Sequence, residues 1–414
     1  MWGGQSCPRR TFRSGMLCLV AFSLLAQTPI QELESKAAAL KAKGDAAGAL
    51  TAYQQAAQLD PKSPRWQDEI GFLLAVMQRR TEAIDHFNQS IQLDPQFAPA
   101  HFHLGVALWL EQQPAKAVPE LQAAADLDPK NAMYQSKLGQ SLETLGHHED
   151  AIAHLKSAVE AQPNDLPAWN SLGAALEKTG NPTAALDAYQ HAVNLDPKNA
   201  DAHNNLGLLL VKTRHADEGI AEFEKVLATD PNNNTARFNI GFAHLLKAEL
   251  DQAIAAFRDL IARDPNHAPA HYNLGVALKN KDDMEGAKAE FARALQIDPS
   301  MAEAHYMTGI TCWQSGEFDR AADEMRAAIA QRSDYGQAYF ILGTVLKQEG
   351  DLPHAEEALR AAVRLISGDP GPYNTLGQLL RQKGDVEGSK RMFAEGARIK
   401  QAKESELGVM LSRQ

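Results

Sequence analysis

The sequence predicts an all-α solenoid, built from one helix pair that is repeated along most of its 414 residues. Two observations carry this prediction: glycine recurs at a fixed interval, and apolar residues within each interval follow helical rather than strand spacing. A constant interval of this size indicates one supersecondary unit stacked on copies of itself. The glycines, each 34 residues after the last, are Gly71, Gly105, Gly139, Gly173, Gly207, Gly241, Gly275, Gly309, Gly343 and Gly377.

Each repeat is predicted to fold as a helix, a tight turn, a second helix and a short link. Around Gly207, one apolar stripe contains Leu206 and Leu209, and the next contains Phe223 and Val226. A polar break, often Gly-Asp, separates the stripes, and an Asp-Pro link precedes most of the glycines. Glycine just past a helix supplies a left-handed terminus, while proline prevents the second helix from continuing.

Two further positions keep the same interval. A small residue stands 12 positions after each glycine and a large apolar residue stands 16 positions after it, as at Gly219 and Phe223. We expect the glycine and the small residue to mark a close helix crossing, because a larger side chain would hold the backbones apart. The large residue is expected to fill the gap left by the neighbouring repeat.

These residues resemble the tetratricopeptide repeat, whose pattern is Trp-x2-Leu-Gly-x2-Tyr, then Ala, Phe or Tyr, Ala and Pro. The copy that matches best runs Trp169-Asn170-Ser171-Leu172-Gly173, followed by Leu176, Ala185, Tyr189, Ala192 and Pro197. The resemblance covers 11 repeats within residues 27–403. They are 30–63, 64–97, 98–131, 132–165, 166–199, 200–233, 234–267, 268–301, 302–335, 336–369 and 370–403.

The resemblance implies a right-handed α-solenoid superhelix of antiparallel helix pairs. The first repeat is degenerate, with Ala37 in place of glycine. Terminal copies are expected to depart from the pattern, since they face water on one side. Residues 404–414 are predicted to form a C-terminal capping extension of the last helix.

The first 26 residues do not share the repeat. Arg9, Arg10 and Arg13 precede an apolar run from Met16 to Ala26, which is typical of a secretory signal peptide cleaved after Ala26. The run is shorter than the roughly 20 residues that cross a bilayer. We expect export to the periplasm or the cell exterior. The alternative is an uncleaved N-terminal anchor that tethers the protein to the membrane, facing outside.

Charge and cysteine content narrow the function classes. The formal net charge is −11, and removal of the leader takes away three arginines and no acid, which gives −14. Nucleic acid is therefore excluded as a partner, because phosphate binding needs clustered cations. Cys312 would be the single cysteine left after cleavage, so no internal disulfide can form, and we expect it to pack in the core.

No catalytic signature appears in the sequence. It has no phosphate-binding glycine loop, Cys-x2-Cys, His-Glu-x2-His or Gly-x-Ser-x-Gly. We therefore predict a protein that is not an enzyme and that holds no cofactor or metal. Four histidines occupy a slot that is aromatic in the family, and repeats about 10 Å apart cannot bring them within the roughly 2.1 Å that zinc requires. We expect structural roles for these residues, which are His101, His203, His271 and His305.

In the family, the first helix of each repeat lines a concave wall on which peptide ligands lie. The resemblance places there the residues two before the glycine, one after it, and four to five after it. Apolar and aromatic side chains gather toward both ends of this wall and mark a partner surface, while Lys137 and Gln140 are among the polar residues of its middle. The predicted partner-binding residues are Phe72, Trp109, Asn205, Asn239, Phe242, Leu246, Tyr272, Asn273, Tyr306 and Trp313.

Two sets within this group have alternatives. Tyr272 and Tyr306 lie three before the glycine, where the family is commonly aromatic for packing. Asn205, Asn239 and Asn273 are equivalent on three consecutive repeats, and an amide suits peptide backbone because it donates and accepts at once. Agreement with the repeat consensus is the other explanation for them.

The sequence thus predicts a protein–protein interaction scaffold that binds an extended peptide or protein in its concave groove, exported to the cell envelope. The alternative is an accessory subunit of an envelope polysaccharide- or protein-export machine. Such a subunit would act through its edges and convex face instead.

Overall fold

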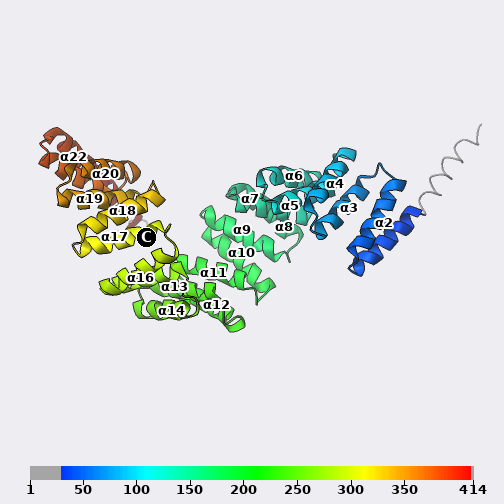
Figure 1. Ribbon diagram of the computed structural model, residues 1–414, viewed down its shortest axis with the longest axis horizontal. Helices are drawn as coiled ribbons and strands as arrows, with labels where there is room; N and C mark the ends of the chain where they lie inside the picture. Colours follow the sequence, from blue (N-terminus) through cyan, green and yellow to red (C-terminus); the bar gives the residue numbers. More distant parts are fainter. Residues whose placement is uncertain (1–28, 412–414) are drawn as a thin grey trace, which may run out of the picture. The chain divides into compact units, whose positions relative to one another are not determined.

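The structure, a computed structural model, describes residues 29–411. It divides into two compact halves, one ending at Asn205 and one beginning at Leu206, and we describe each by itself. Between residues 29 and 411 the chain consists of helices, turns and short links, without a strand. This confirms the predicted all-α solenoid (Figure 1). The predicted signal peptide, residues 1–26, lies outside the described residues.

The helices alternate along both halves. After a helix at residues 29–42, the N-terminal half contains α2 (Ala46–Leu59), α3 (Pro64–Val76), α4 (Arg80–Leu93), α5 (Ala98–Leu110), α6 (Pro114–Leu127), α7 (Ala132–Thr144), α8 (His148–Ala161), α9 (Leu166–Lys178) and α10 (Pro182–Leu195). Helix α11 (Ala200–Lys212) contains the boundary between the halves.

The C-terminal half continues with α12 (Ala216–Thr229), α13 (Asn234–Leu246), α14 (Leu250–Arg263), α15 (Ala268–Asn280), α16 (Met284–Ile297), α17 (Ala302–Gln314), α18 (Phe318–Gln331), α19 (Gly336–Glu349), α20 (Leu352–Leu365), α21 (Pro370–Gln382) and α22 (Val386–Leu411). Because α22 runs to Leu411, the predicted C-terminal extension is helical as far as the structure describes it. Among the described helices, none has both the length and the hydropathy of a bilayer span.

Helices pack with their neighbours in sequence. Within each half, an odd-numbered helix packs most extensively against the even-numbered helix that follows it, as α3 does against α4. Odd-numbered helices of successive repeats also touch one another, as do α3 and α5, α7 and α9, and α13 and α15. The first helices therefore form a shared side within each half, which is where the family resemblance locates the wall.

A left-handed residue ends the first helix in most repeats. Gly146, Gly180, Gly316, Gly350 and Gly384 have φ between 77° and 87°, as the sequence predicted. Other repeats place a larger side chain in the same conformation, with φ between 57° and 69°. These are Gln78, Gln112, Arg214, Ala248 and Asp282. The turn geometry thus persists where glycine, its least strained residue, is missing.

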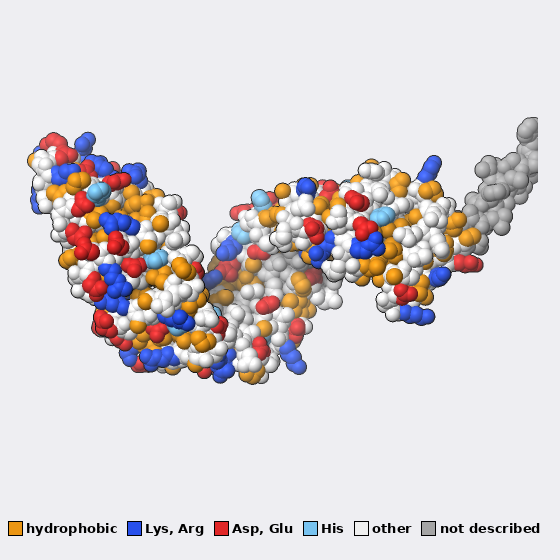
Figure 2. Space-filling model, viewed as in Figure 1, with side chains coloured by type: hydrophobic (Ala, Val, Ile, Leu, Met, Phe, Trp, Pro, Cys, Tyr) orange, Lys and Arg blue, Asp and Glu red, His pale blue; other side chains and the backbone are white. Residues whose placement is uncertain are grey.

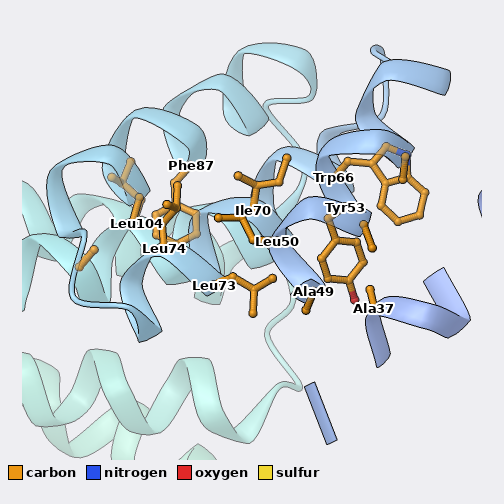
Figure 3. Close-up of a cluster of buried hydrophobic side chains, with 14 of the residues drawn as sticks. Ala37, Ala49, Leu50, Tyr53, Trp66, Ile70, Leu73, Leu74, Phe87 and Leu104 are labelled. Atoms are coloured by element: carbon orange, nitrogen blue, oxygen red, sulfur yellow. The ribbon is translucent and has the colours of Figure 1, made fainter. Parts of the chain in front are cut away.

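The core runs as a chain of apolar side chains through successive helices. In the first repeats, Tyr53 and Trp66 stack with ring centroids 6.1 Å apart, and Ile70 and Leu73 continue the layer, each 2% exposed (Figure 3). Phe87 from α4 closes it on the other side. Each layer is made by two adjacent helix pairs, so each repeat depends on its neighbours for burial.

The repeat glycine is the point of closest approach inside each pair. A Cβ at Gly207 would lie 2.5 Å from Cε1 of Phe223 and 3.0 Å from the carbonyl oxygen of Gly219. Similar contacts join Gly105 to Leu121. The large residue also packs toward the neighbouring repeat, as expected: the centroid of the Phe87 ring lies 5.6 Å from that of the His103 ring in the next repeat. The large side chain lies over the glycine of its own repeat, because the two helices of one pair approach most closely there.

We expect Gly207→Leu to lower the free energy of unfolding by about 1–3 kcal/mol, because its side chain must displace Phe223. Chemical denaturation with far-UV circular dichroism measures the change. Gly368→Leu is the matched control, since no atom lies within 4 Å of a Cβ at Gly368. Equal stability of the two variants would contradict the crowded crossing.

Candidate binding groove

In several repeats, a side chain four residues before the repeat glycine holds the helix pair to the preceding link. In His271, Nδ1 lies 2.6 Å from Oε2 of Glu290, and Nε2 lies 3.2 Å from the carbonyl oxygen of Pro265. His101 and His305 make the same two contacts, one with a glutamate of their own repeat and one with the proline carbonyl at the end of the preceding repeat. Nε2 of His203 lies 3.1 Å from the Pro197 oxygen. The predicted structural role of these histidines is confirmed.

Other residue types use this position in the same way. Trp169 donates from Nε1 to the Pro163 oxygen at 2.9 Å, and Gln135 donates from Nε2 to the Pro129 oxygen at 3.2 Å. In the latter repeat the second-helix partner is His154, whose Nδ1 lies 2.7 Å from Oε1 of Gln135. The sequence signal for this contact is a polar residue 19 positions later, which the repeat pattern alone did not reveal.

Cys312 is fully buried in α17, and burial raises the pKa of its thiol, which disfavours the nucleophilic thiolate. In the part of the chain that the structure describes, no three His, Cys, Asp or Glu side chains lie together in a way that could hold a metal ion.

A groove of about 660 Å³ opens on the first helices of the N-terminal half. Its lining is mainly apolar and comes largely from α3, α5 and the start of α7. The predicted residue Phe72 lines it and is 36% exposed, whereas Trp109 instead packs at the edge of the core. The other lining residues are Ala75, Val76, Gln78, Arg80, Phe87, Phe102, His103, Val106, Ala107, Leu110, Met133 and Lys137.

The base of this groove contains a buried polar contact between two repeats. Nδ1 of His103 on α5 lies 2.8 Å from Oδ1 of Asp68 on α3, and Asp68 is only 6% exposed. The rings of Phe72, Phe87 and Phe102 lie 5.5 to 5.6 Å from the His103 ring. Aromatic packing and the paired polar atoms therefore fix the groove's shape before any ligand arrives.

The groove changes character at α7. A second hollow of about 500 Å³ shares Phe102, Met133 and Lys137 with the first and extends to the link before α9. Most of its further lining residues have polar side chains: Ser136, Gln140, Gln162, Asn164 and Asp165, beside Leu166 and Pro167. An apolar section thus continues into a section that can hydrogen-bond a peptide backbone.

The predicted aromatic residues of the C-terminal half are half-buried at the margin of its core. Phe242 stacks on Phe238 with centroids 6.4 Å apart. Trp313 donates from Nε1 to Oε1 of Gln348 at 2.7 Å, which ties α17 to α19. Burial raises the pKa of the Tyr272 hydroxyl. These rings therefore combine packing with partial exposure.

The two remaining apolar candidates, Tyr306 and Leu246, differ in solvent exposure. Tyr306 packs against Tyr335 at a centroid distance of 4.9 Å, and burial raises the pKa of its hydroxyl. Leu246 is 57% exposed at the end of α13. Leu246 is the more accessible of the two for a partner.

The three asparagines are placed differently. Asn205 is partly buried in the N-terminal half, while Asn239 and Asn273 lie in the C-terminal half. Asn239 is only 5% exposed. The Asn273 amide donates to the Pro269 carbonyl of its own helix at 2.9 Å. These two amides would have to give up contacts or move before they could bind a peptide backbone.

The visible surface carries both signs of charge. On the face shown in Figure 2, acidic and basic side chains are interspersed, and hydrophobic side chains gather over α2 and α3. Several charges are paired between repeats, for example Lys41 with Glu69 at 3.0 Å. Exposed pairs of this kind contribute little to stability.

Comparison with known proteins agrees with this geometry. Two tetratricopeptide repeat models match the chain, one at residues 136–200, 247–302 and 306–370 and the other at 74–141 and 176–239. The chain belongs to the tetratricopeptide repeat family, whose fold supports protein–protein interaction scaffolds. A search of curated proteins returned no match.

Solved structures show the same fold. A tetratricopeptide repeat protein from Parabacteroides merdae is 16% identical with a TM-score of 0.53, and the match covers 60% of this chain and 98% of that one. Yeast Tom70 is 15% identical with a TM-score of 0.50, and the match covers 93% of this chain and 95% of that one. At these identities the likeness concerns the fold alone.

Two histidines that contact a glutamine predict a pH dependence of stability: His154, described above, and His86, whose Nδ1 lies 2.8 Å from Oε1 of Gln67. Burial lowers the pKa of both His86 and His154, below the usual value of about 6.5. The unfolded chain therefore takes up these protons first, so their stabilising contribution is complete above about pH 6.5 and is lost as pH falls. The double variant His86→Gln and His154→Gln should lose less Tm between about pH 7 and pH 5 than the parent.

Differential scanning fluorimetry across this range measures the effect. His147→Gln is the control, because His147 is exposed at the start of α8. An identical pH slope in the parent and the double variant would contradict the assignment.

Proposed function

We propose that this protein is a non-enzymatic scaffold of the cell envelope that binds an extended peptide or protein segment along its first helices. The family supports an interaction scaffold, and the groove on α3, α5 and α7 is the observation that carries the more specific statement. An apolar hollow with convergent polar groups at one end is the usual form of a binding site.

The dimensions of the groove favour an extended segment. Packed helices lie about 8–10 Å apart, so the path from α3 across α5 to α7 is about 16–20 Å. An extended chain advances about 3.3 Å per residue and would cover this path with five or six residues. Alternate side chains would point into the hollow, and the amides beyond α7 would hold the backbone.

Exposed apolar side chains at the rim support recognition rather than packing. Val76 and Leu110 are 54% and 55% exposed, although both line the hollow. Burial of such side chains under a partner would contribute about 25 cal/mol for each Å² removed from water. The proposed lack of catalysis is supported by Cys312, whose thiolate is disfavoured, and by histidines whose ring nitrogens are engaged by a glutamate and by the preceding link.

Export is supported by the leader alone. The arginines before Met16 and the apolar run to Ala26 have the pattern of a cleaved signal peptide. We place the scaffold in the periplasm or outside the cell on this ground. An uncleaved leader would instead tether it to the membrane with the repeats facing outside.

We expect a photo-crosslinking amino acid at Leu110 to capture a protein partner in cells, while the same residue at Leu59 captures none. Leu59 is 54% exposed at the end of the second helix α2, which makes it a matched control. The combined change Val76→Ser and Leu110→Ser should weaken binding of that partner by about tenfold, because two apolar contacts are lost. Its unfolding free energy should change by less than about 1 kcal/mol, since both sites are exposed.

Crosslinks confined to second helices would favour the accessory-subunit function, which acts through edges and the convex face. Trp313→Ala with Phe242→Ala applies the same test to the C-terminal half. Unchanged binding in both double variants would remove the proposed recognition surface.

For export, we expect the mature protein from envelope extract to begin at Gln27, as intact mass and N-terminal peptide mapping would show. Ala26→Arg should block cleavage and retain the leader, because the processing enzyme needs a small residue there. A chain that keeps Met1 and fractionates with the cytosol would contradict export.

A further inference from the structure

Lys137 differs from the other cations in or beside the groove, which are paired with carboxylates. Arg80 lies 3.6 Å from Glu111, and Lys41, which lies over the Phe72 ring, is paired with Glu69. Lys137 is partly buried in α7 and has no ion pair or hydrogen bond with any residue of the described chain. Burial lowers the pKa of its ammonium group, and no neighbouring charge contributes to the shift. An unpaired ammonium in such a place is costly unless a ligand supplies the missing anion.

Lys137 lies where the two hollows of the groove meet, so a ligand anion paired with it would have one hollow on each side. It lines both the apolar hollow, with Met133 and Phe102, and the polar hollow that continues toward α9. A ligand that reaches Lys137 therefore has apolar contacts in one direction and amide contacts in the other. Gln140 on α7, whose amide donates to Ser136 Oγ at 2.8 Å, is one such group.

We propose that the groove selects peptide segments in which a large apolar side chain is followed closely by aspartate or glutamate, with the carboxylate paired to Lys137. This inference rests on the proposed function, since it requires that the groove bind an extended peptide. The apolar side chain would enter the hollow beside Phe72, Val106 and Leu110. The acidic side chain would then reach the boundary between the two hollows.

Charge matching favours a carboxylate over a phosphate group. A carboxylate carries one negative charge and is matched by one lysine, whereas a phosphoryl group carries nearly two and needs further cations. The polar hollow supplies none among its lining residues, and it contains the Asp165 carboxylate, which caps α9 by accepting from the Ala168 amide at 3.0 Å. The Asp165 carboxylate would therefore repel the phosphate group of a ligand.

Continuity of the groove favours a side chain over a chain terminus. Hollow space extends on both sides of Lys137, so a bound segment can pass the lysine instead of ending at it. The carboxylate is therefore assigned to an internal aspartate or glutamate.

The test uses a phage library of random dodecapeptides, each displayed with a linker on both sides. Peptides are selected in parallel on the full chain and on its variants Lys137→Met and Lys137→Glu. The parent should enrich peptides with Asp or Glu next to a large apolar residue. Lys137→Met should lose the acidic preference but keep the apolar one, and Lys137→Glu should turn the preference toward Lys or Arg. Lys130→Met, an exposed lysine in the link before α7, is the control and should select as the parent does.

The best parental peptide, synthesised with blocked ends, then gives the magnitude by fluorescence anisotropy. Lys137→Met should weaken its binding by about tenfold or more, the range expected for a hydrogen bond to a charged group. Lys137→Arg should retain most of the affinity. Replacement of the peptide's acid by the neutral amide should weaken binding to the parent but not to Lys137→Met.

The outcomes separate the two proposals. Selected peptides whose acidic preference survives in Lys137→Met would overturn the lysine assignment and leave the peptide groove standing. A preference for phosphoserine or a free C-terminus in matched synthetic peptides would overturn it as well. If the parent selects no peptide at all, the proposed function of the groove fails together with this inference. Methionine is a good helix former, and circular dichroism verifies that α7 variants fold.

Discussion

The contact between each repeat glycine and the large side chain 16 positions later is the constraint on which the structure depends. It allows the two helices of a pair to cross so closely that an added methyl group at the glycine would overlap the large side chain, as between Gly207 and Phe223. Once the pair closes, its outer faces are apolar and must be covered by neighbouring pairs. The stack, the shared side of first helices and the groove upon it all follow from this local closure.

The helix pair and its packing were largely predictable from the sequence, because the same pattern of residues recurs in every repeat. One glycine at a helix crossing would be a weak signal, but ten at a constant interval define the helix pair, its turn and its link. The left-handed turn was predicted from Gly350 and its equivalents. Its persistence at Ala248, where no glycine stands, followed only from the structure. Periodic patterns reveal the average repeat and not the exceptions that neighbours enforce.

The groove was less predictable, because it depends on pairs of side chains rather than on one repeat position. Phe72 was predicted to face a partner, and it lines the hollow. Trp109 fits the same rule but packs at the core edge. Asn239 and Asn273 share a register, yet one is nearly inaccessible and the other donates to its own helix. The Asp68–His103 contact needs two particular residues in adjacent repeats, so no single-position pattern could have indicated it.

The layered core also has a mechanical consequence for binding. Because each repeat is buried only by its neighbours, the repeats at the N-terminal end can unfold locally without disturbing distant repeats. A segment lying across α3, α5 and α7 would bridge successive pairs that otherwise touch only in sequence order. Its binding free energy would then oppose local unfolding of the N-terminal repeats. An occupied groove would therefore stabilise the repeats that form it.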